Sequence, residues 1–394
     1  MSKIETTNAG HKITTSRGEH RGELSAQWAS RPADQRFLSV DDLIAHFNKI
    51  ETNEKLLDFA LADAEIKVIE SKVEDVDDRI EFHLPEVGAV EPSHWSFNQL
   101  CYEAGANPDY IRKCPAFLQE MNLNYWLWAS TNERRAYLMP QKKSFDLRGV
   151  TSQTYGRILN GDVAREIKRV NDETGGRWKV PGMIDWGKMT HNPNVDVTTQ
   201  STTLYASDRD MFVFLCDDRN PIEIGKLDDG SPDYVFRGFI ASNSDVGARR
   251  FDFMSFLLRG VCFNRNLWGV EDFQQFTIRH TPGAPARFDE EVLPALEIYA
   301  ESTTTNVIGK VKAAKQLAIA STDEEAVDWL RMRGLSKKLA DQSIETSLIE
   351  EQRPLRTIWD ASQAVTAVAR TIDVQENRVR LEQLAGGWMD KVAA

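Results

Sequence analysis

Cysteine is scarce in this chain of 394 residues, which contains four: Cys101, Cys114, Cys216 and Cys262. They lie far apart and form no C-x-x-C pair, which excludes the usual sequence motifs of a zinc knuckle or a dithiol redox site. Scattered, unpaired cysteines are typical of proteins in a reducing compartment, so the sequence predicts a cytoplasmic location.

Long apolar runs are also missing. No uninterrupted stretch approaches the roughly 20 residues that a membrane-spanning helix needs, and the most apolar segment, residues 251–263, contains Asp252 and Arg259. The first 20 residues are polar and lack the apolar stretch of an export signal. The sequence therefore predicts no membrane partner.

The common enzyme signatures are absent. The chain has no G-x-x-x-x-G-K-[ST] phosphate loop and no G-x-G-x-x-G, H-E-x-x-H or G-x-S-x-G motif. Its seven histidines lie singly, without an i, i+4 pair on a helix. We therefore expect no cofactor and no catalytic residue, although a Cys–His pair formed only in space stays open.

The composition is that of an ordinary globular protein, with 41% apolar and 27% charged residues. A net charge of −12 argues against a protein that binds nucleic acid over its whole surface, so the local distribution of charge matters more. The chain length predicts two or three domains.

The pattern along the chain predicts an α+β fold, in which a central mixed α/β domain with an antiparallel-rich sheet precedes an all-helical domain. Residues 1–36 are poor in large apolar side chains and predict a flexible arm. Residues 37–280 form the central domain, residues 281–287 a linker rich in Pro and Gly, and residues 288–394 the helical domain.

Within the central domain, Ser39 followed by two acids predicts a capped helix, and residues 65–70, 79–84, 211–216 and 234–240 read as strands. The apolar segment 253–259 predicts a buried helix. Trp126 and Trp128 lie two apart in a helical segment, so we expect one of them to face solvent or a partner.

The segment 131–180 is the main candidate for a nucleic-acid surface. It contains 11 Lys/Arg against 6 Asp/Glu, with Tyr137, Phe145, Tyr155 and Trp178 interleaved. Cations that follow phosphates and aromatic rings that stack on bases are how proteins hold single strands. The alternative is a solvated surface that balances residues 51–91, which carry 13 acids against 4 bases.

Two further groups are weaker candidates. Residues 241–250 could form an anion-binding loop reinforced by Arg249 and Arg250, or a turn whose Asn243 and Asp245 cap a following helix. Four carboxylates could hold Mg²⁺ for phosphoryl hydrolysis, but they lie at both ends of one strand and cannot all share one ion. These weak metal candidates are Asp208, Asp210, Asp217 and Asp218.

Five stretches of the sequence resemble a phage/plasmid-like family of domains of unknown function, number 932. They are residues 31–39 (RPADQRFLS), 207–215 (SDRDMFVFL), 242–247 (SNSDVG), 259–264 (RGVCFN) and 357–366 (TIWDASQAVT). The resemblance covers about residue 25 to the end. It implies a protein carried by phages, prophages or plasmids in a bacterial host cell, and it implies no catalytic residues.

These observations lead to one function hypothesis with two alternatives. The first is a non-enzymatic protein that binds or anneals single-stranded DNA and assists recombination. Its predicted contact residues are Arg134, Arg135, Lys142, Lys143, Arg148, Tyr155, Arg157, Arg249 and Arg250. The alternatives are a structural or regulatory protein whose helical tail binds a partner or a second copy, and a metal-dependent nuclease.

Overall fold

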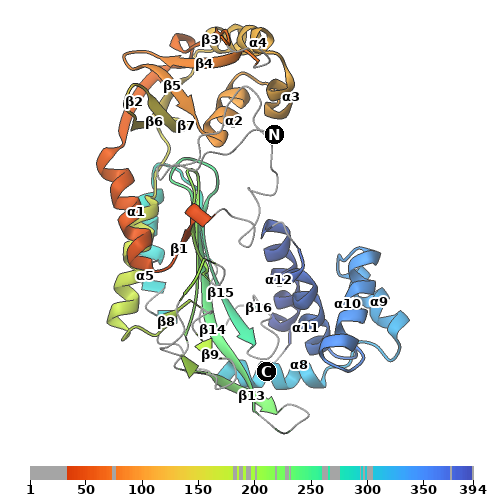
Figure 1. The fold of residues 1–394 in the computed structure, drawn as a ribbon. Helices are drawn as coiled ribbons and strands as arrows, with labels where there is room; N and C mark the ends of the chain where they lie inside the picture. Colours follow the sequence, from red (N-terminus) through yellow and green to blue (C-terminus); the bar gives the residue numbers. More distant parts are fainter. Residues whose placement is uncertain are drawn as a thin grey trace.

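The computed structural model shows two large β-sheets, one above the other in Figure 1, and a group of helices formed by the C-terminal part of the chain. It describes residues 33–72, 77–180, 184–185, 190–191, 197–199, 202–217, 220–226, 230, 232–259, 265–266, 276–292, 294–295, 298–299, 305–372 and 375–392. The fold is α+β with antiparallel-rich sheets, as the sequence predicts. Most of the predicted arm and two of the site candidates, Cys262 and Asp218, lie outside the described residues.

The smaller sheet and three helices form a domain of residues 55–151, which we call the small domain. Its strand order is β2-β6-β7-β5-β4-β3, antiparallel except for the pair of β5 and β7. The strands are β2 (Lys55–Ala60), β3 (Glu65–Ile69), β4 (Arg79–Leu84), β5 (Gly88–Pro92), β6 (Glu133–Pro140) and β7 (Phe145–Thr151). The helices are α2 (His94–Glu103), α3 (Pro108–Lys113) and α4 (Ala116–Trp128). These elements bury one shared apolar core.

The larger sheet is antiparallel, with β1-β11-β12-β14-β15-β16 as its main order and β8, β13 and β17 paired at its sides. Its strands are β1 (Arg36–Phe37), β8 (Trp178–Lys179), β11 (Leu204–Ala206), β12 (Met211–Asp217), β13 (Ile222–Lys226), β14 (Pro232–Asn243), β15 (Phe251–Arg259), β16 (Arg265–Asn266) and β17 (Phe276–Ile278). A separate two-stranded ladder joins β9 (Ile184–Asp185) to β10 (Thr190–His191).

Two helices, α1 (Val40–Asn53) and α5 (Asn160–Glu173), lie side by side along the large sheet (Figure 1). Ser39 caps α1 by accepting a hydrogen bond from the Asp42 amide, as its sequence predicts. Side chains of β12 alternate between two cores: Met211 and Val213 belong to the core that α1 and α5 share, and Phe212 belongs to the other. The small domain is inserted in the chain between α1 and α5.

The C-terminal part of the chain is helical, as predicted. Its helices are α6 (Ala284–Arg287), α8 (Thr305–Gln316), α9 (Asp323–Met332), α10 (Lys337–Glu350), α11 (Ile358–Arg370) and α12 (Gln375–Asp390), with a π-helical turn at Phe288–Val292. Five apolar residues that recur at roughly helical spacing in this tail are buried: Leu355, Ile358, Trp359, Val365 and Val368. They pack against neighbouring parts of the same chain.

One element differs from its prediction. Residues 253–259, expected to form a buried helix, belong to strand β15, which pairs with β14 along its length. Phe253 and Phe256 enter different cores because both faces of this strand are covered. A strand buried on both faces is apolar at every position, so its sequence cannot be distinguished from a buried helix by periodicity.

The boundary predicted at residues 281–287 stays a prediction, and packing groups the chain in another way. One apolar core extends from Leu43 through the large sheet to Val392, and a second belongs to the small domain. The segment itself contains α6, and Ala284 is buried in the larger core.

Candidate functional site

The two arginines that begin the predicted nucleic-acid segment are each held by a carboxylate. Arg134 donates from Nε and Nη2 to the two oxygens of Glu103, both at 2.7 Å. Arg135 makes the same bidentate pair with Asp58, also at 2.7 Å. Bidentate pairs of this kind satisfy the guanidinium group, so neither arginine is available to a phosphate without losing its partner.

Lys142 and Lys143 remain exposed at the turn between β6 and β7. Arg250 is half exposed, and its Nε lies 3.0 Å from Asp252. The Arg249 guanidinium covers the Phe212 ring at 4.1 Å from the ring centre. Of these four cations, the two lysines are thus exposed, while Arg249 and Arg250 each contact a side chain of the large sheet.

Arg148 and Arg157 form a closed ion-pair cluster with Glu54 and Asp245, which we call the buried quartet. Arg148 contacts Glu54 through Nη1 and lies 3.1 Å from Asp245. Arg157 lies 2.6 Å from Glu54 and 2.9 Å from Asp245. The side chains of Arg148, Glu54 and Asp245 are 4–6% exposed. Three of the four side chains are thus almost fully buried, and Arg157 is 17% exposed.

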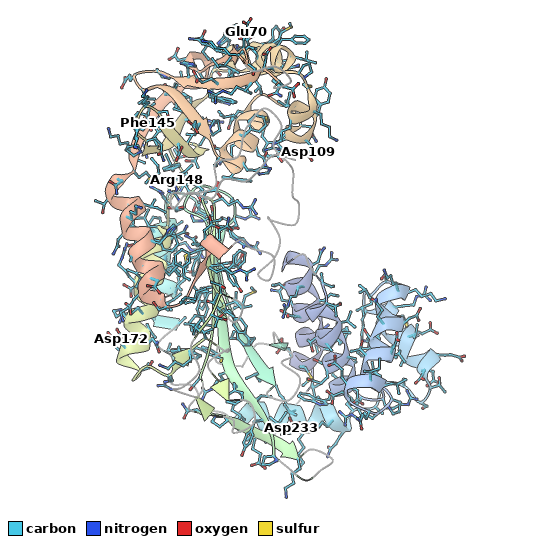
Figure 2. The ribbon with its side chains drawn as sticks, viewed as in Figure 1. Glu70, Asp109, Phe145, Arg148, Asp172 and Asp233 are labelled. Carbon is cyan, nitrogen blue, oxygen red and sulfur yellow. The ribbon has the colours of Figure 1, made fainter. Side chains whose placement is uncertain are left out.

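The quartet lies where the two sheets meet, as the position of Arg148 shows (Figure 2). Glu54 ends α1, Arg148 belongs to β7 and Asp245 follows β14, so the cluster joins the small domain to the large sheet at the point of insertion. Burial alone would raise the pKa of Asp245, but Arg148 and Arg157 outweigh it and lower that pKa. Asp245 is therefore charged and paired with both arginines at neutral pH.

Tyr155, the predicted base-stacking residue, is also engaged. Its ring stacks on His280 with 4.7 Å between the ring centres, and its hydroxyl donates to the Ser244 carbonyl at 2.9 Å. Burial raises its pKa. A base could stack on this ring only by displacing His280.

The loop 241–250 resolves into neither of the two expected forms. No helix follows it, because β15 begins at Phe251. Its Asp245 carboxylate faces the two arginines of the quartet, and Asn160 donates to the same carboxylate at 3.2 Å. The loop therefore contributes an anion to a buried cluster, and its role as an anion-binding loop stays a prediction.

The acidic candidates for a metal site are dispersed. Asp210 accepts a hydrogen bond from Ser207 at 2.7 Å, and Asp217 accepts one from Asn220 at 2.9 Å at the other end of β12. Within the described part of the chain, no group of three or more His, Cys, Asp or Glu side chains could hold a metal ion. Cys101 is buried, and burial raises its pKa to about 12, which disfavours the nucleophilic thiolate.

An exposed apolar face on α4 contains one residue singled out from the sequence, Trp128, and three that were not. Phe117, Met121, Tyr125 and Trp128 are 59%, 62%, 65% and 55% exposed. Their spacing of four, four and three residues places them on one stripe of the helix, about 16 Å long at 1.5 Å per residue. We call these four residues the α4 face.

The opposite side of α4 explains how this face is held. Ala116, Leu123 and Leu127 are buried in the small-domain core. Asn124 donates to the Ile66 carbonyl and accepts from its amide, both at 2.8 Å, which fixes the helix on β3. The α4 face is thus carried by a rigid element and points away from the core.

The aromatic rings of this region are themselves ordered. The Trp128 Nε1 donates to the Ala64 carbonyl at 3.2 Å, and Trp126 meets Tyr125 edge to face with 5.0 Å between ring centres. The spacing of Trp126 and Trp128 predicts that one of them faces solvent or a partner, and in the structure both are more than half exposed. At about 150–250 Å² per aromatic side chain, the α4 face exposes roughly 400 Å². Apolar patches of that size on soluble proteins are often functional.

His46 on α1 lies close enough to the buried quartet for its pKa to be affected by Arg148 and Asp245, and this makes the stability of the fold depend on pH. Burial, followed by the charges of Arg148 and Lys49, lowers its pKa from 6.5 to about 4, while Asp245 opposes the shift. The folded protein holds this imidazole neutral, whereas the unfolded chain protonates it below pH 6.5, so stability falls as the pH falls toward 4.

We therefore expect wild type to lose about 2 kcal/mol of unfolding free energy between pH 7 and pH 5 because of His46. His280, whose pKa burial also lowers, acts in the same direction. Urea denaturation of wild type and of His46→Gln at both pH values measures the difference. Parallel losses in the two proteins would show that His46 does not titrate differently on folding.

Among the described helices, none is long and apolar enough to cross a membrane. Comparison with known proteins gives no further guide to the site, since no family model, no curated protein and no solved structure matches this chain. The resemblance to the phage/plasmid-like family, number 932, stays a prediction.

Proposed function

We propose that this protein is a non-enzymatic binding protein whose α4 face docks a basic, amphipathic segment of a partner protein. The observation that carries the proposal is the single stripe of Phe117, Met121, Tyr125 and Trp128, each more than half exposed. Partner helices recognise such a stripe through apolar anchors at i, i+3, i+4 and i+7. Tyr and Trp are also the residues that most often dominate the free energy of an interface.

Charge indicates the chemistry of the partner. The small domain carries 16 Asp/Glu against 11 Lys/Arg. Glu70 and Asp109 lie on the part of this domain that holds β3, α3 and α4 (Figure 2). A segment with Lys or Arg beside its apolar anchors is complementary to this surface. A second copy of the chain would bring two acidic small domains together, which is less favourable.

Single-strand binding through residues 131–180 is supported less well. Of its predicted contacts, Arg134, Arg135, Arg148 and Arg157 are paired with carboxylates. Lys142 and Lys143 keep exposed ammonium groups, so the hypothesis stays testable through them. Partner binding by the helical tail has less support than the α4 face, because the apolar residues at helical spacing in residues 355–368 are buried.

Two synthetic helical peptides test the proposed function, one with Leu and Lys, the other with Leu and Glu in the same pattern. We expect the full-length protein to bind the basic peptide at least tenfold more tightly, as measured by anisotropy of labelled peptide. Phe117→Ser with Tyr125→Ser should weaken that binding at least tenfold, because both anchors are lost. These positions are exposed, so the double variant should stay folded.

The matched control replaces two exposed apolar residues elsewhere, Met332→Ser and Ile349→Ser, which are 78% and 69% exposed in wild type. This control should bind the basic peptide as wild type does. Equal binding of both peptides, or an unchanged affinity of the α4 double variant, would contradict the proposal. Sedimentation that shows self-association abolished by the α4 double variant would assign the face to a second copy instead.

A further inference from the structure

A second exposed surface, formed by the turn between α9 and α10, is strongly basic. Residues 331–338 contain four cations and no acid, in a chain whose net charge is −12. All four side chains are exposed: Arg331, Arg333, Lys337 and Lys338. Arg331 has one carboxylate near it, Asp328 at 3.8 Å, in a pair that is more than half exposed on both sides. Such a pair is weak and easily exchanged for another anion.

The turn is rigid. Gly334 has a φ of +99°, a conformation that favours glycine, and lets the chain reverse within four residues. Leu335 is buried in the larger core between the two helices. Arg333 lies flat on Trp329, with its guanidinium 3.7 Å from the ring centre. The cations are therefore presented by a fixed corner of the fold, on the outer side of the helical domain (Figure 1).

The two lysines are not explained by helix stability. They occupy the first turn of α10, where the partial positive charge of the helix end disfavours cations. Helix α9 has the favourable arrangement, with Asp323, Glu324 and Glu325 in its first turn. The positive charge at the start of α10 thus lowers the stability of that helix, and a bound polyanion would compensate for it.

We propose that the corner formed by Arg331, Arg333, Lys337 and Lys338 binds the phosphate backbone of duplex DNA, without sequence preference. Four closely spaced cations match a polyanion with one charge per roughly 1.7 Å of axis. Residues 331–338 contain no aromatic side chain, so the surface lacks the stacking platform of a single-strand site. Asp341 and Glu345 lie on the exposed side of α10, where they would repel the phosphates and disfavour insertion of this helix into a groove of the DNA.

An anionic membrane fits this corner less well. A membrane-surface helix needs an apolar side next to its cations. The exposed apolar residues of α10 are Leu348 and Ile349, about 15 Å from Lys338 at 1.5 Å per residue. Met332 is the exposed apolar side chain within the corner.

Fluorescence anisotropy with a labelled duplex of random sequence tests the proposal. With four phosphate contacts, the wild-type affinity should fall about 150-fold between 50 and 200 mM salt. The variant Arg333→Ala/Lys337→Ala/Lys338→Ala keeps one contact, so its affinity should fall only about threefold over the same range. At 50 mM salt it should bind at least tenfold more weakly than wild type. The matched control replaces two exposed cations elsewhere, Lys72→Ala/Lys113→Ala, and should bind the duplex as wild type does. Lys142→Ala/Lys143→Ala tests the other candidate DNA surface.

A second pair of measurements separates binding from folding. Lys337→Glu with Lys338→Glu should raise the melting temperature, since it complements the helix end, and should abolish DNA binding. Several results would overturn the proposal: no wild-type affinity at 50 mM salt, a loss of affinity in the Lys142/Lys143 variant alone, or retention of phosphatidylserine vesicles in place of DNA. Each of these results is independent of peptide binding at the α4 face, so the two proposals can fail separately.

Discussion

Arg148→Met is expected to lower the free energy of unfolding by about 3–5 kcal/mol. The substitution leaves Glu54 and Asp245 buried at 4–5% exposure with only Arg157 to balance two negative charges. Breaking a buried pair costs more than the pair itself contributes, because a carboxylate cannot regain water where it lies. The methionine side chain has a similar length, so lost charge and not lost volume is responsible.

Arg135→Met is the matched control. Arg135 also holds a carboxylate in a bidentate pair, but its side chain and that of Asp58 are 32% and 45% exposed. Loss of an exposed pair costs about 1 kcal/mol or less. Urea denaturation at neutral pH measures both variants. If the two substitutions cost the same, the quartet would be no more than a surface pair, and its role in joining the small domain to the large sheet would be refuted.

Restoring charge balance should recover part of the loss. In Arg148→Met/Glu54→Gln, one arginine faces one carboxylate, and the glutamine can still accept a hydrogen bond from Arg157. We expect this double variant to be more stable than Arg148→Met alone. A cost that is additive over the two substitutions would indicate that the two side chains do not interact.

Local elements of the fold could be predicted because their signals are short-range. Residues close to one another in the sequence predict the cap at Ser39, the alternating strands β3 and β4, and the tail helices α9, α10 and α11. Strand β15 could not be predicted in this way. Its residues are apolar on both sides because the sheet is covered on both faces, and only the pairing with β14 reveals that.

The ion-pair partners of the candidate residues could not be predicted from the sequence either. The basic character of residues 131–180 is real in the sequence, but the partners that neutralise it lie far away: Glu54 is 94 residues from Arg148, and Asp58 is 77 residues from Arg135. No spacing rule indicates such pairs. The α4 face, by contrast, could have been found, since Phe117, Met121, Tyr125 and Trp128 follow helical spacing on the side opposite Leu123 and Leu127.

Gly156→Ala is expected to destabilise the protein by about 3 kcal/mol, the upper part of the range for overpacking. A β-carbon at this position would lie 1.7 Å from the Thr281 carbonyl oxygen and 2.6 Å from its carbonyl carbon. Both are backbone atoms, so no side-chain rotation relieves the clash. The Gly156 amide also donates to the His280 carbonyl at 3.1 Å, and that hydrogen bond would be stretched as the segments separate.

Gly283→Ala, two residues after Thr281, should instead raise the free energy of unfolding. Nothing lies within 4 Å of its β-carbon position, and its φ of −84° suits any residue. Such a change stabilises by about 0.4–1 kcal/mol, because it reduces the freedom of the unfolded chain. Denaturant midpoints of the two variants measure the contrast. If Gly156→Ala is as stable as wild type, residues 281–287 do not pack against residue 156, and the division of the chain at this segment would be favoured. If it is destabilised as predicted, residues 281–282 pack against residue 156, and the segment is a fixed part of the larger core.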